Sequence, residues 1–156
     1  MLTPSLIIGG LVFVYGTVIG SFLNVCIHRI PREESVISPR SRCPECRKPI
    51  PAWHNLPVIS YLILRGRCAG CGKPISLRYP AVEILTGLIL TGLYLKYGIG
   101  AAFFINSFFC CLLTALIFID LDARILPDVI TLGGIGAGLL CSPWQDPAFL
   151  DLTLGF

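Results

Sequence analysis

Four of the eight cysteines form two close pairs, and their spacing is typical of a metal site. Two residues separate Cys43 from Cys46, and two separate Cys68 from Cys71. Two thiolates at this spacing can reach one tetrahedral ion from a single tight turn, and a second pair completes the coordination shell. The 21 residues between the pairs slightly exceed the usual zinc spacing of about 15–20 residues. The sequence therefore predicts a structural zinc site, since four cysteines leave no open position for water.

The same short motif surrounds both cysteine pairs. The pattern C-x2-C-x-K-P-I begins at Cys43 and again at Cys68, an offset of 25 residues. Two similar turns that face one ion are what a zinc ribbon requires. Two disulfides are the alternative, and both the repeated motif and a reducing cytoplasm argue against them. The other four cysteines lie in or beside apolar segments and are expected to be small buried hydrophobic residues; they are Cys26, Cys110, Cys111 and Cys141.

Three aspartates follow directly after a long uncharged segment. Residues 99–119 carry no formal charge, and Asp120, Asp122 and Asp128 come within the next nine residues. An acid at the rim of a membrane is a functional candidate, and Asp120 fits this description best. Asp122 has a structural alternative in an ion pair with Arg124. Asp128 has one as the cap of the following helix.

Peptide hydrolysis is the chemistry that such acids could perform. An aspartic protease uses two carboxyl groups that share one proton, one to activate water and the other to protonate the scissile carbonyl. We expect Asp120 to be one of the two. Glu83 is a further acid near the same face of the membrane, and it could instead form a structural ion pair with Arg78. The sequence leaves both interpretations of Glu83 open.

The elements that must position these residues are apolar helices. The chain is 54% hydrophobic and 13% charged, about half the charged share of a typical soluble domain. So small a globule cannot bury that much apolar surface, and a lipid bilayer removes the problem. Four membrane helices are expected, the last of which is short and would use Trp144 as an interfacial anchor; they cover residues 5–25, 81–97, 99–119 and 129–141. After Pro147 the chain turns apolar again.

Two glycines in the first apolar segment have the spacing of a helix contact. Gly16 and Gly20 form a GxxxG pair, which would allow a neighbouring helix to approach closely. The alternative is coincidence in a glycine-rich helix.

Basic residues are concentrated in one loop. Ten of the twelve lysines and arginines lie between Arg29 and Arg78. The positive-inside rule then places this loop in the cytoplasm and the N-terminus on the opposite side of the membrane. The loop could touch anionic lipid headgroups, whereas no motif supports nucleic-acid binding.

The predicted fold is an all-α polytopic membrane protein with a small cytoplasmic zinc-ribbon-like loop domain. We expect a first transmembrane helix in residues 1–28 and a four-cysteine zinc domain in residues 29–80. Residues 81–156 are expected to hold transmembrane helices with the Asp120 motif.

The motifs, taken in order, resemble the bacterial type IV prepilin peptidase/N-methyltransferase family. The matching stretches are residues 20–31, 55–62, 64–68 and 78–87, both cysteine motifs, and Asp120 through Asp128. The resemblance implies a multi-pass enzyme of the bacterial inner membrane. Such enzymes cut the leader from prepilins and pseudopilins of pili and type II secretion systems, on the cytoplasmic side. They then methylate the new N-terminus with S-adenosylmethionine, and Asp120 matches the family's first catalytic aspartate.

The sequence departs from the family pattern at the second catalytic aspartate. That residue lies in a Gly-x-Gly-Asp motif on a later helix, and this sequence contains no such motif. Asp122 or Asp128 could take its place, although Asp128 has its own matching position in the family. We therefore expect the N-terminal part of such an enzyme, truncated at its C-terminus, with a second chain as a possible source of the missing helices. The alternatives are a non-catalytic, membrane-anchored zinc module that binds pilin precursors or a partner subunit, and a nonfunctional fragment.

Overall fold

The computed structural model describes residues 4–38, 40–43, 45–51 and 55–145, and within them the chain is helical and contains no strand. The tail after Pro147 lies outside the described residues, as does the side chain of Trp144. In order along the chain, the elements are α1 (Pro4–Arg29), the short 3-10 helix η1 (Ile30–Arg32), α2 (Ile59–Ile63), α3 (Arg78–Tyr97), α4 (Ala101–Ala123) and α5 (Asp128–Gln145). The prediction of a mostly helical protein is therefore confirmed.

The long helices coincide with the predicted apolar segments. Within the described residues, two stretches are long and apolar enough to cross a membrane, Pro4–Arg32 and Ala101–Ala123, and a shorter apolar helix covers Asp128–Cys141. Helix α4 continues past the predicted end at residue 119, because the aspartates that follow do not by themselves stop a helix. It ends at Arg124, whose left-handed backbone (φ 53°) lets its N–H donate to the carbonyl of Asp120 at 2.8 Å. This is a common way to close an α-helix. The remaining predicted spans stay predictions.

Helices α1 and α3 cross at very short range, and glycines make this possible. A Cβ atom added to Gly16 would lie 2.7 Å from the Cα of Gly87, and one added to Gly20 would lie 2.7 Å from the Cα of Glu83. No side chain could occupy either place without moving the neighbouring backbone. The prediction that Gly16 and Gly20 allow close approach of a helix is confirmed, and the neighbour is α3.

The interior of the bundle is apolar, and so is much of its outer surface. The larger of two buried clusters joins α1, α3, α4 and α5 and consists of Leu23, Ile27, Val82, Ala115, Ile119 and Ile130. Large apolar side chains also point outward on α1 and α4, among them Leu11, Val14, Phe22, Phe104, Leu113 and Ile117. Soluble monomers rarely expose contiguous apolar surface on this scale, which supports a lipid environment for the helices.

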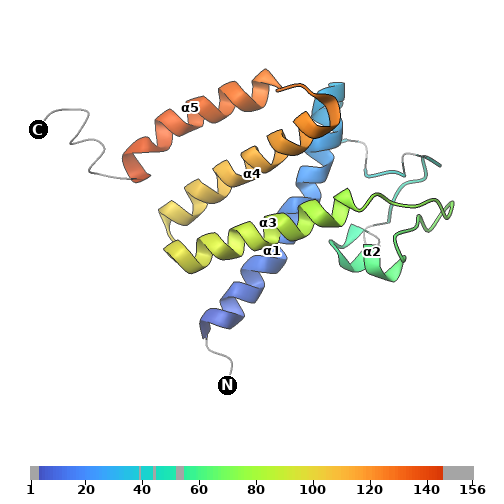
Figure 1. Ribbon diagram of the computed structural model, residues 1–156, viewed down its shortest axis with the longest axis horizontal. Helices are drawn as coiled ribbons and strands as arrows, with labels where there is room; N and C mark the ends of the chain where they lie inside the picture. Colours follow the sequence, from blue (N-terminus) through green and yellow to red (C-terminus); the bar gives the residue numbers. More distant parts are fainter. Residues whose placement is uncertain (1–3, 39, 44, 52–54, 146–156) are drawn as a thin grey trace, which may run out of the picture.

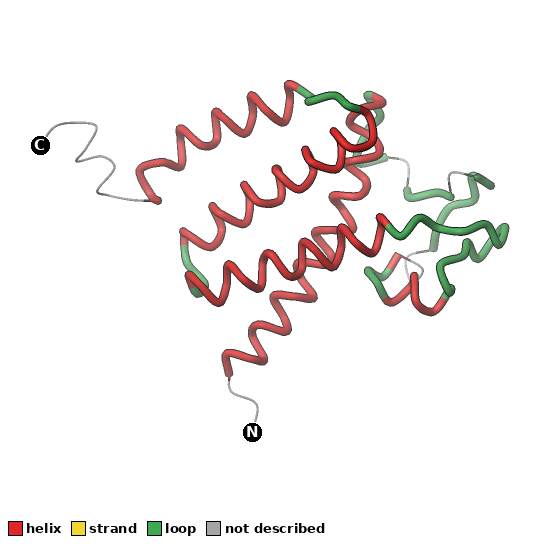
Figure 2. Tube along the Cα trace, in the orientation of Figure 1, coloured by secondary structure: helices red, strands yellow, loops and turns green. Residues whose placement is uncertain are grey.

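All the predicted functional segments lie at one end of the helical bundle. Residues 98–100 and 124–127 form short connections that reverse the chain between α3, α4 and α5. The C-terminal ends of α1 and α4 and the N-terminal ends of α3 and α5 consequently gather beside the loop of residues 33–77 (Figure 1, Figure 2). The cysteine motifs and the three aspartates thus lie on the same side of the helices.

Candidate metal centre and candidate active site

The two cysteine motifs fold into turns with the same backbone hydrogen bonds. In the first, the N–H of Cys43 donates to the carbonyl of Lys48 at 3.1 Å, and the N–H of Arg47 donates to the carbonyl of Cys43 at 2.9 Å. Both bonds recur 25 residues later in the second turn, each at 2.8 Å. Arg47 and its counterpart Gly72 both have a positive φ, 56° and 71°. The repeat in sequence is therefore a repeat in structure.

The turns bring four sulfur atoms together. The Sγ atoms of Cys43, Cys46, Cys68 and Cys71 all lie within 4.8 Å of one another, and those of Cys43 and Cys71 are 3.9 Å apart. A tetrahedral zinc ion with bonds of about 2.3 Å requires sulfur atoms about 3.8 Å apart. All four cysteines are free thiols. The geometry thus fits a single ion and does not fit the alternative of two disulfides.

Backbone N–H groups favour the thiolate form, which a metal requires, at Cys68. The N–H of Gly70 donates to the Sγ of Cys68 at 3.3 Å. Together with the N–H of Cys71, it lowers the pKa of the Cys68 thiol to about 7. At Cys71, a hydrogen bond from the backbone of Lys73 is outweighed by desolvation and by the neighbouring thiols, which instead raise the pKa of that thiol to about 11. Lys73 in the second turn also pairs with Glu45 in the first. This ion pair joins the two turns independently of any metal.

The acidic segment spans the end of α4 and the start of α5. Asp120 lies exposed in the last turn of α4. Asp122 pairs with Arg78, the first residue of α3. The predicted partner Arg124 was wrong, because residues two apart on a helix do not face each other and the side chain of Asp122 points toward the neighbouring helix instead. Asp128 is exposed as the first residue of α5, where the helix dipole favours a negative charge.

Glu83 is used to hold the loop against the helices. Its side chain is buried, and its Oε2 accepts a hydrogen bond from the backbone N–H of Val58 at 2.8 Å. The hydroxyl of Ser21 on α1 also bonds to this carboxyl group. The predicted ion pair of Glu83 with Arg78 is wrong, since Arg78 is paired with Asp122. Residues five apart on one helix also point in different directions.

Asn24 is a further polar residue at the place where α1 meets the start of α3, and it was not among the residues predicted from the sequence. It is 4% exposed, and its Nδ2 donates to the carbonyl of Tyr79 at 3.0 Å. It therefore ties α1 to the start of α3, next to Arg78. The sequence did contain a signal, namely an amide side chain inside an otherwise apolar segment. Polar groups are costly in such segments and usually have a polar partner or a functional role.

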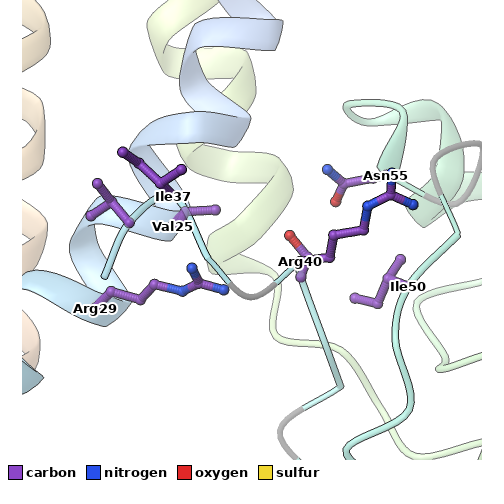
Figure 3. A pocket seen from close by; sticks show the side chains of 8 residues that line it. Val25, Arg29, Ile37, Arg40, Ile50 and Asn55 are labelled. Atoms are coloured by element: carbon purple, nitrogen blue, oxygen red, sulfur yellow. The ribbon is translucent and has the colours of Figure 1, made fainter. Parts of the chain in front are cut away.

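A cavity of about 310 Å³ lies where the end of α1 meets the loop. The guanidinium group of Arg29 points toward it from α1, and the side chain of Arg40 extends across it toward Asn55 (Figure 3). Among the described residues that line it, none is acidic. The apolar side chains that line it include Val25 and Ile50, and Ile37 lies at its open edge, 91% exposed. Such a cavity suits a small ligand with an anionic group and an apolar part.

The comparisons with known proteins agree with the resemblance seen in the motifs. Residues 14–97, more than half of the chain, match the family model described as the bacterial peptidase A24 N-terminal domain. A prepilin leader peptidase/N-methyltransferase of Myxococcus xanthus is 45% identical over 144 residues, which cover 92% of this chain and 43% of that protein.

Two further relatives carry the same name. The protein of Aeromonas hydrophila is 42% identical and that of Neisseria gonorrhoeae 38% identical, over 83% and 81% of this chain and 53% of each relative. The chain thus spans about half the length of the curated relatives it matches. No solved structure matches it. The comparisons give no support to the predicted second chain.

Proposed function

The chain belongs to the bacterial A24 peptidase family, and on this basis we propose that it acts as a membrane aspartic endopeptidase and N-methyltransferase. The substrates are type IV prepilins and pseudopilins, whose leader is removed at the cytoplasmic face of the inner membrane. The proposed topology places the N-terminus in the periplasm and the zinc domain of residues 29–80 in the cytoplasm. The family match over residues 14–97 is the observation that carries this proposal.

Asp120 is the proposed catalytic residue. Its carboxyl group is exposed at the end of α4, at the same end of the bundle as the loop, where a leader peptide in the cytoplasm can reach it. In the reaction, one carboxylate takes a proton from water while a protonated carboxyl group donates to the carbonyl oxygen of the scissile bond. Of the two other aspartates in this segment, Asp128 is the candidate for the second group, because it is exposed whereas Asp122 is engaged by Arg78. Asp122 and Glu83 have supporting roles as anchors.

The two cofactors have separate places in this proposal. Cys43, Cys46, Cys68 and Cys71 would hold zinc, which would organise the loop and take no part in the chemistry. S-adenosylmethionine would supply the methyl group for the new N-terminal amine. In the cavity between α1 and the loop, the exposed Arg40 would bind the carboxylate of this donor, while Arg29, whose guanidinium donates to the carbonyl of Ser35 at 2.7 Å, would add positive charge to the wall.

Leader cleavage by the purified 156-residue chain in detergent tests the proposal. We expect the wild-type chain to shorten a prepilin and the Asp120→Ala variant to leave it intact, with equal zinc content in both. Cleavage by Asp120→Ala at the wild-type rate would remove Asp120 from the mechanism.

A non-catalytic zinc module that binds pilin precursors is the second candidate function. The four-cysteine cluster, which forms within the loop from Cys43, Cys46, Cys68 and Cys71, favours it. Binding of a prepilin by the folded, zinc-loaded wild-type chain without any cleavage would establish this alternative in place of the peptidase.

A further inference from the structure

Helix α2 has its polar and apolar faces reversed relative to a water-exposed helix. Ser60 is buried, and the hydroxyl of Tyr61 donates to the carbonyl of Ile75 in the second cysteine turn at 3.4 Å. The polar side chains therefore face the protein. The opposite face is apolar and open, with exposed fractions of 54% for Ile59, 68% for Leu62 and 73% for Ile63. These three residues lie at i, i+3 and i+4, and so they share one face of the helix.

A hydrogen bond fixes the level of α2 along the bundle. The N–H of Val58, just before α2, donates to Glu83 at 2.8 Å. Glu83 comes five residues after Arg78, the first residue of α3, which at 1.5 Å per residue is a distance of about 7.5 Å along the helix. Figure 1 shows α2 just past the N-terminal end of α3, on the side of the loop. An apolar face at this level would lie at the loop end of the membrane helices, near the depth at which lipid headgroups meet acyl chains.

The charges around α2 are arranged as at a membrane surface. Residues 55–64 carry no charge, and Arg65 and Arg67 follow immediately. Arginine side chains of this kind can extend to lipid phosphates while their stems cover apolar surface. Anionic lipids of the cytoplasmic leaflet attract such basic residues.

We propose that α2 is an interfacial membrane anchor, with Ile59, Leu62 and Ile63 inserted between lipid headgroups and acyl chains and Arg65 and Arg67 bound to anionic headgroups. Short apolar faces insert in this way without spanning the bilayer. The charge distribution alone suggests a loop wholly surrounded by cytoplasm. With this anchor, part of the loop instead lies in the membrane surface. This assignment goes beyond the proposed catalytic function and does not depend on it.

The anchor fixes the position of the metal site. The N–H of Gly66 donates to the carbonyl of Tyr61 at 2.8 Å, and the carbonyl of Gly66 accepts from the N–H of Ile75 at 2.7 Å. These bonds join α2 to both sides of the second cysteine turn. The four-cysteine site is thereby held at the membrane surface, on the side where the acidic segment lies.

Tryptophan fluorescence in lipid vesicles tests the anchor. The full chain, with Trp53→Phe and Trp144→Phe to remove background, would carry Ile59→Trp, Leu62→Trp or Ile63→Trp and be placed in phosphatidylcholine/phosphatidylglycerol vesicles. The control is Ala69→Trp, at an exposed position of the second cysteine turn. Equal zinc content shows that each variant is folded. Because three positions carry the probe, the test can still be made if one variant does not fold.

We expect the three α2 variants to lose fluorescence when the acyl chains are brominated and to resist iodide in the water. Ala69→Trp should show the opposite pattern. The anchor would be overturned if iodide quenched the α2 variants as strongly as it quenches Ala69→Trp and brominated acyl chains caused no loss of their fluorescence. Iodide quenching that an added prepilin relieves would overturn it too, because the face would then bind a protein.

Discussion

The guanidinium group of Arg78 pairs with the carboxylate of Asp122 and so joins the start of α3 to the last turn of α4. Arg78 comes seven residues after Cys71, the last cysteine of the metal site, and Asp122 comes two residues after Asp120. The ion pair therefore links the segment that follows the zinc loop to the helix turn that carries the proposed catalytic aspartate. A change in the loop can reach Asp120 through it.

This link should be measurable as a coupling energy. Arg78→Gln and Asp122→Asn should each lower the free energy of unfolding, and the double variant should lose less than their sum. The difference should be about 1 kcal/mol, because the pair is partly shielded from water. This coupling energy is obtained from the free energies of unfolding of the four proteins, measured in a titration with denaturing detergent. The matched control is the Lys73–Glu45 pair, whose side chains are 59% and 50% exposed. It should couple more weakly, and equal coupling in both pairs would contradict the expected shielding.

The glycine contact between α1 and α3 predicts a position-dependent effect of alanine. Gly16→Ala and Gly20→Ala should each destabilise the helix pair by about 1–3 kcal/mol, since the new Cβ atom would meet backbone at 2.7 Å. Gly10→Ala is the control in the same helix, with nothing within 4 Å of the added atom, and should be neutral or slightly stabilising. The same detergent titration measures all three. Equal effects at the three positions would mean that the close crossing does not exist.

Removal of one cysteine ligand should release the metal. Cys43→Ser should lose zinc and leave the loop open to proteases, because structural zinc contributes directly to folding. Metal analysis of the purified chain and limited proteolysis measure both effects. The control is Cys141→Ser, a free thiol on α5 outside the cluster, which should keep the full metal content. Retention of zinc in Cys43→Ser would refute the four-cysteine site.

The cavity at the end of α1 predicts a separation of the two proposed activities. Arg40→Gln should lower methylation of a cleaved pilin and raise the concentration of S-adenosylmethionine required, while leader cleavage stays unchanged. Transfer of a labelled methyl group, followed beside cleavage, measures both. Arg42→Gln is the matched control, because Arg42 is exposed in the same segment and does not line the cavity. A parallel loss of both activities in Arg40→Gln would argue for a general disturbance of the loop.

The features that could be predicted from the sequence are those with a local pattern. The spacing of Cys43, Cys46, Cys68 and Cys71 identified the cluster, since a C-x2-C turn forms from adjacent residues. The apolar segments identified the four long helices, and the spacing of Gly16 and Gly20 identified a close contact. Each of these patterns depends on neighbours along the chain.

The contacts that were wrong or missed join distant residues that have no shared pattern. Arg78 and Asp122 are 44 positions apart, and only the packing of α3 on α4 makes them partners. Glu83 binds a backbone N–H, a group that every residue except proline carries, so no sequence feature could point to Val58. Helix α2 is five residues long. This is too short for its polar and apolar faces to appear as a helical repeat in the sequence.

The repeated cysteine turn also determines how the loop would respond to being cut. Its ligands lie on both sides of α2, and Cys43 and Cys71 are 28 positions apart. With zinc bound, the ion would act as a removable cross-link, much as a disulfide closes a long loop in an oxidising compartment. A protease that severed the chain between the two turns would leave both turns attached to one ion, and the cut loop would keep this cross-link until a chelator removed the metal.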